Sequence, residues 1–70
     1  MTAADRMLAA RAELMERIER TADAHALNDA ELVAVMVHAA AAVLIERTGV
    51  SPPQAGEMLA TSVRRYVAGP

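Results

Sequence analysis

The chain has 70 residues, the size of one small domain, and contains no cysteine, phenylalanine or tryptophan. Disulfide bonds are therefore excluded, and no cluster of Cys and His predicts a structural metal site. The formal charge is −2, with seven arginines and no lysine. This charge argues against a domain held on nucleic acid mainly by neutralising phosphates, and the missing lysine removes lysine-based catalysis.

A domain of this size is marginally stable, because it buries only about 60% of the surface that its unfolded chain exposes. Small domains usually compensate with disulfides, a bound metal or a partner chain. Because the first two are not predicted, we expect this chain to oligomerise. Hydrophobic residues make up 54% of the sequence and are mostly Ala, Val, Leu and Met. Such small side chains let helix axes approach closely.

The first predicted element is a helix over Ala3–Ala24, where good helix formers dominate and neither Gly nor Pro occurs. Its apolar residues recur three, four and seven positions apart and predict one stripe. The stripe consists of Met7, Leu8, Leu14, Met15, Ile18 and Ala22. Glu13 with Arg17, and Glu16 with Arg20, are spaced as stabilising pairs on the opposite face. We interpret that face as solvated, with a docking face for a charged partner as the alternative.

The second predicted helix spans Asp29–Thr48 and follows a turn over residues 23–29. Asn28 and Asp29 are good N-cap residues, and Gly49 is a natural residue for the end of the helix. From Leu32 to Ile45 only His38 is polar. A helix that is apolar on all sides is normally surrounded, so we expect this helix to be the buried centre of the domain.

Two faces of the second helix are predicted to make different contacts. The main internal seam is expected to consist of Val33, Met36, Val37, Ala40, Val43 and Leu44. The interface with a neighbouring chain is expected to consist of Leu32, Val35, His38, Ala39 and Ala42. We favour a homodimer, since two short helices cannot cover every side of a third. The alternative is that the alanine face is simply exposed, which costs little.

The third predicted helix spans residues 52–67 and has the best-marked start. Ser51 is an N-cap, Pro52 stands at the first helical position, and Gln54 lies where it can bond back to the cap. Apolar residues then recur with helical spacing up to Tyr66. The sequence thus predicts a single all-α domain over residues 1–70, built as a compact three-helix unit within an oligomeric bundle.

No constellation of residues predicts catalysis or ligand binding. Ser51 and Ser62 could serve as nucleophiles and His25 and His38 as bases, but Ser51 is explained as a cap and no glycine-rich elbow precedes either serine. The spacing of acidic residues and histidines matches no metal motif. We therefore predict no enzyme activity, no cofactor and no metal. If His38 is interfacial, assembly weakens as the pH falls through the imidazole range.

The segment Thr48-Gly49-Val50-Ser51, followed by a helix, resembles the turn of a helix-turn-helix DNA-binding motif. The resemblance implies that the helix from Pro52 reads DNA, with Gln54 and Glu57 facing bases and Arg64 and Arg65 near phosphates. Ile45 departs from the motif, which has a small residue there. The segment from Ala42 through Ser51 to Ala55 is also similar to part of the ANTAR RNA-binding module. An ordinary helical hairpin remains the alternative to both.

The sequence leaves two classes of function open. The first is a regulator, adaptor or inhibitor that acts by self-association and by binding a protein partner. The alternative is a dimeric nucleic-acid-binding regulator that uses the hairpin over residues 42–66. The longest apolar run, Leu32 to Ile45, is shorter than the roughly 20 residues that a bilayer span needs, and no secretory signal is expected. We expect a cytoplasmic protein that binds neither a membrane nor a small-molecule substrate.

Overall fold

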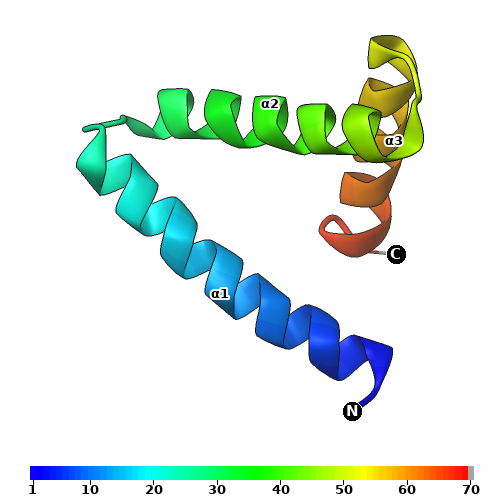
Figure 1. The fold of residues 1–70 in the computed structure, drawn as a ribbon, viewed down its shortest axis with the longest axis horizontal. Coiled ribbons are helices and arrows are strands. Elements are labelled where there is room, and N and C mark those ends of the chain that lie inside the picture. The colour runs from blue at the N-terminus through cyan, green and yellow to red at the C-terminus, as the bar shows by residue number, and fades with distance from the viewer. Residues whose placement is uncertain (70) are drawn as a thin grey trace. The chain divides into compact units, whose positions relative to one another are not determined.

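The computed structural model describes residues 1–69 and contains three helices over that range, with no strand. These are α1 (Ala3–Ala24), α2 (Asp29–Thr48) and α3 (Pro52–Tyr66), as Figure 1 shows. The all-α prediction is confirmed, and the bounds of the first two helices are those predicted. Helix α3 ends one residue before the predicted Val67, whose backbone N–H donates to the carbonyl of Val63. The chain divides into two compact units, Met1–Leu32 and a second unit from Val33 onward.

The first two helices begin with reciprocal hydrogen bonds between the N-cap residue and the residue three positions later. In α1 the Asp5 backbone N–H donates to Thr2 Oγ1 at 3.1 Å, and the Thr2 N–H donates to Asp5 Oδ2 at 3.0 Å. In α2 the Glu31 N–H donates to Asn28 Oδ1 at 2.8 Å, and the Asn28 N–H donates to Glu31 Oε1 at 3.0 Å. Each pair satisfies two backbone donors that a helix N-terminus otherwise leaves free.

Helix α3 begins in the same way, as the sequence predicts. The Gln54 N–H donates to Ser51 Oγ at 3.3 Å, and the Ser51 N–H donates to Gln54 Oε1 at 2.8 Å. Pro52 and Pro53 occupy the first two helical positions. Proline is tolerated there because the first N–H groups of a helix have no intrahelical acceptor. The predicted cap at Ser51 is therefore confirmed.

Left-handed residues end the first two helices. Ala26 has φ +50, and the Leu27 N–H donates to the Ala22 carbonyl at 3.0 Å, which is the bonding pattern of a Schellman motif. Gly49 has φ +73 after α2, and its N–H donates to the Ile45 carbonyl at 2.8 Å. The predicted stop at Gly49 is confirmed. No glycine follows α1, and an alanine takes the same conformation there.

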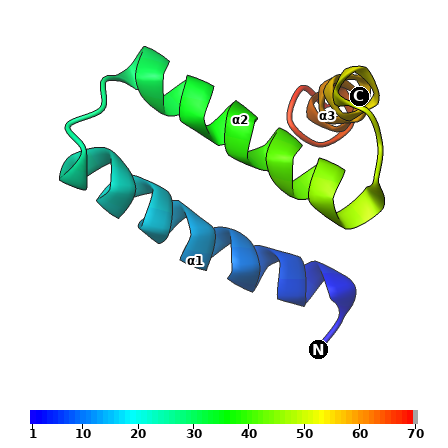
Figure 2. The same cartoon turned by 45° about the horizontal axis from the view of Figure 1, so that its top comes forward.

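Within the second unit, α3 turns sharply across the end of α2, with a bend of 115° between the two helices (Figures 1 and 2). Ala55, in the first turn of α3, is completely buried. The half-buried side chains of this unit gather mainly near the corner where the two helices meet. They include Ala41, Leu44 and Ile45 at the end of α2, Val50 in the turn, and Leu59 in α3.

Across the described residues, no single helix combines the length and hydrophobicity of a membrane span; α2 and α3 taken together meet both criteria, but they are bent by 115°.

Candidate interaction surface

Most large hydrophobic side chains among residues 1–69 are exposed rather than buried. Among residues 1–69 the only buried apolar residues are Ala22, at 9% exposure, and Ala55. No large side chain in that range is fully buried. Helix α2 contains no buried residue at all, so its predicted role as the buried centre of the domain is not confirmed. The apolar helix faces are therefore the most prominent candidates for contact with another molecule.

Four of the five residues predicted to form the interface are exposed on α2. Val35 is 44% exposed, and His38, Ala39 and Ala42 are also exposed, whereas Leu32 is half-buried. Val35, Ala39 and Ala42 follow one another at intervals of four and three residues, so they lie on one side of the helix. We call these three residues the free face of α2. All three side chains are exposed, and the interface itself stays a prediction.

The predicted internal seam is not confirmed, because most of its positions are exposed. Val33, Val37 and Val43 are 53–56% exposed, and Ala40 is exposed as well. Only Met36 and Leu44 of the predicted seam are half-buried. The physical reason is the 115° bend, because α3 crosses only the last turns of α2 instead of running along it. Ile45, which the prediction leaves out of the seam, is half-buried at that crossing.

Helix α1 presents a second apolar stripe, at the positions that the sequence predicts. Met7, Leu8, Leu14 and Met15 are 49–65% exposed, and Ile18 is half-buried. The charged residue Arg11 lies among the four exposed side chains, and the predicted stripe does not include it. The sequence spacing could have identified Arg11, because all four exposed side chains lie three or four positions from it.

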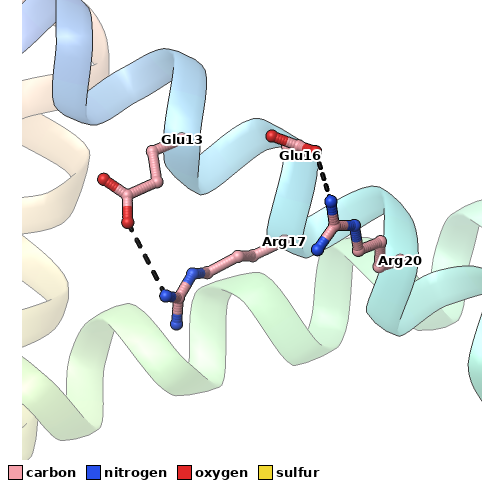
Figure 3. Close-up of polar contacts among 4 residues, drawn as sticks. All are labelled: Glu13, Glu16, Arg17 and Arg20. Carbon is pink, nitrogen blue, oxygen red and sulfur yellow. Dashed lines mark hydrogen bonds and ion pairs between the residues drawn. The ribbon is translucent and has the colours of Figure 1, made fainter.

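The opposite side of α1 carries charged residues that pair along the helix. Arg17 Nη2 lies 3.6 Å from Glu13 Oε1, and Arg20 forms an ion pair and hydrogen bond with Glu16 (Figure 3). All four side chains are at least 63% exposed. Exposed pairs of this kind contribute only about 0.3–0.5 kcal/mol. This arrangement supports the interpretation of a solvated face.

The three residues assigned to the nucleic-acid alternative do not form one patch. Gln54 lies in the first turn of α3, and its side chain is engaged in the cap with Ser51. Arg64 and Arg65 lie in the last turn, about 15 Å further along the helix at 1.5 Å per residue. The Arg64 guanidinium donates to Thr61 Oγ1 at 3.3 Å, and the Arg65 guanidinium lies 6.0 Å from the centre of the Tyr66 ring.

The hydrogen bonds at the start of α1 affect the ionisation of Asp5. Hydrogen bonds from the Thr2 backbone N–H and then from the Thr2 hydroxyl lower the pKa of the Asp5 carboxyl. Both bonds favour the charged form of the acid. The acid belongs to a helix cap, so its low pKa reflects structure and indicates no catalytic role.

The described residues include no group of three or more His, Asp or Glu side chains placed to hold a metal ion. Of the two serines considered as nucleophiles, Ser51 is occupied in the cap of α3. The chain matches no protein-family model, no curated protein and no solved structure.

Proposed function

We propose that this protein is a small, non-enzymatic helical interaction module that works as a homodimer and acts by binding a protein partner. The free face of α2 contributes to the contact between the two copies. The observation that carries the proposal is the exposure of that face in a chain whose buried apolar residues, over the described range, are two alanines.

The energetic argument concerns the cost of ordering the chain. Fixing one residue costs about 1–2 kcal/mol of conformational entropy, which burial of apolar surface must offset. Alanine has little surface to bury, whereas Val33, Val35, Val37 and Val43 remain 44–56% exposed along α2. A second copy supplies an apolar surface of the same character, and identical surfaces related by a twofold axis are the commonest way to build a dimer.

The proposal is tested by the mass of the intact chain in solution, measured by light scattering during size-exclusion chromatography. We expect about twice the chain mass of 7.4 kDa. Ala39→Arg places a charge on the free face of α2 and should return the protein to a single chain that is still helical. Ala9→Arg makes the same change on the charged side of α1 and should leave the dimer intact. A wild-type protein that stays a folded single chain up to high concentration contradicts the proposal.

A second candidate function is nucleic-acid binding by the hairpin of α2 and α3. The observation that favours it is the geometry of the corner, where three residues including Gly49 join two helices bent by 115°. Helix-turn-helix motifs join two helices at about 90–120° through a short turn that often contains glycine. The charge also differs along the chain: counted from the sequence, residues 33–70 carry three arginines and two glutamates, and residues 1–32 carry four arginines and seven acids.

Filter binding of duplex DNA and single-stranded RNA at low salt tests this second candidate. If the hairpin binds phosphates, retention appears at low salt and fades as salt rises. The double variant Arg64→Gln with Arg65→Gln should then weaken binding. The double variant Arg6→Gln with Arg20→Gln removes the same charge from α1 and should change binding less. Absence of binding by the wild type at low salt eliminates the candidate and leaves the interaction module.

A further inference from the structure

A single arginine stands in the middle of the apolar stripe of α1. Arg11 has Met7 and Leu8 four and three positions before it, and Leu14 and Met15 three and four positions after it. These four neighbours are exposed, so Arg11 and its surroundings form one continuous surface. Within residues 1–69, the ion pairs of α1 involve Arg17 and Arg20, and none involves Arg11.

Whatever covers this stripe has to supply a carboxylate opposite Arg11. Removing a charge from water without a partner is costly, and the cost is offset only by an opposite charge in good geometry. The apolar stretch of α2 from Leu32 to Ile45 contains no Asp or Glu, so it offers no such partner. Helix α3 has a single acid, Glu57, in its second turn.

A second copy of α1 supplies the missing carboxylate when the two helices run antiparallel. Glu19 lies four positions after Met15, at the edge of the apolar stripe, and forms no ion pair among the described residues. If two antiparallel helices cross at Met15, residue n of one faces residue 30 − n of the other. Arg11 then faces Glu19 of the second copy. In the parallel arrangement in register, Arg11 faces Arg11 and is repelled.

The same register places Met15 of one copy against Met15 of the other, and this side chain is 49% exposed. Methionine is unbranched and adaptable, so two such side chains can pack where the helices cross. Ala22 is already buried in its own chain, so the contact is confined to the exposed part of the stripe.

We propose that α1 is a self-association surface that pairs antiparallel with α1 of a second copy, with two symmetric ion pairs between Arg11 and Glu19. This inference rests on the proposed homodimer and assigns to α1 a second contact within that same dimer, which forms together with the contact of the free face of α2. The pairing requires that the charges at positions 11 and 19 be complementary between the two copies, and exchanging these charges tests it.

The experiment compares Arg11→Glu, Glu19→Arg and an equimolar mixture of the two variants by analytical ultracentrifugation. Each variant alone brings like charges together twice, so its dissociation constant should rise about tenfold or more. In a mixed dimer, the glutamate that replaces Arg11 in one chain faces the arginine that replaces Glu19 in the other. The second pair of that dimer is the unchanged Arg11 with Glu19. The mixed dimer should therefore associate with a dissociation constant within about threefold of the wild type.

Matched control variants are Arg17→Glu and Glu13→Arg, which change the same charges on the solvated side of α1. Neither these variants nor their mixture should move the dissociation constant more than about twofold. Circular dichroism follows helix content throughout. If a single variant loses helix, recovery of helix and mass on mixing still supports the pairing, because a defect confined to one chain cannot be repaired by the other.

Two outcomes separate this inference from the proposed function. A wild type that never self-associates overturns both. A wild-type dimer whose mass is insensitive to the single charge reversals, or whose variants fail to recover on mixing, overturns the α1 pairing alone and leaves the free face of α2 as the contact.

Discussion

At the scale of single residues, the N-cap at Thr2 links the ionisation of Asp5 to the formation of the first turn of α1. The Thr2 N–H and hydroxyl both donate to the Asp5 carboxylate, which lowers the pKa of that acid. Because the folded-state pKa is below the unfolded value, the cap stabilises the helix at neutral pH, and this stabilisation is lost as the pH falls through the folded-state pKa.

An NMR titration of the Asp5 carboxyl carbon checks this assignment. The midpoint should lie below the ordinary value for aspartate, and Thr2→Val should raise it by removing the hydroxyl while leaving the backbone N–H. A midpoint that does not respond to Thr2→Val contradicts the hydroxyl's part in the cap.

The left-handed residues that follow α1 and α2 predict stability changes of opposite sign for Ala26→Gly and Gly49→Ala. Ala26 has φ +50, which costs an L-amino acid about 1 kcal/mol, so Ala26→Gly should stabilise the protein by up to about that amount. Gly49 has φ +73, so Gly49→Ala should destabilise by about 1 kcal/mol, although nothing lies within 4 Å of the added Cβ. Urea denaturation at fixed protein concentration measures both. A change of the same sign in the two variants contradicts the backbone explanation.

Some of these residue-level features can be predicted from the sequence and others cannot. The roles of Ser51 and Gly49 are predictable because their residue types are strongly preferred at caps. The role of Ala26 is not, since alanine rarely takes positive φ and here follows from the Schellman bonds around it. Arg11 is visible in the spacing but belongs to no motif, because its importance depends on what covers the stripe.

At the scale of elements, the N-cap of α3 should contribute measurably to the free energy of unfolding. Ser51→Ala removes the oxygen that accepts from the Gln54 N–H and should cost about 1 kcal/mol. Ser62→Ala makes the same change at an exposed position inside α3, where alanine's helix propensity should leave stability unchanged or slightly raised. Equal effects of the two substitutions on thermal unfolding would argue against the cap.

The extent of each helix is predictable from the sequence, whereas the direction of its faces is only partly so. Helix ends are fixed by local signals such as Asn28 and Gly49, which act within a few residues. The stripe of α1 is predictable because polar residues flank it. In α2 only His38 is polar between Leu32 and Ile45, so periodicity cannot indicate which side meets α3, and Val37, which the prediction places in the internal seam, is exposed.

At the scale of the whole molecule, the proposed dimer makes stability depend on protein concentration. When folding is coupled to association, each increase in concentration favours the folded state by mass action. We expect the melting temperature to rise over a hundredfold increase in concentration, measured by circular dichroism. The variant Ala39→Arg should melt at a lower temperature that is independent of concentration. A concentration-independent wild-type melting temperature contradicts coupling between folding and association.

The three reciprocal caps also bear on how fast the chain folds. The side chains of Thr2, Asn28 and Ser51 bond to residues three positions away, so each helix start is specified by contacts of very short sequence separation. Proteins dominated by local contacts cross their folding barrier in microseconds to milliseconds. A chain built this way meets another copy with its helices already started. We therefore expect the encounter between two copies, which slows on dilution, to limit the rate of assembly.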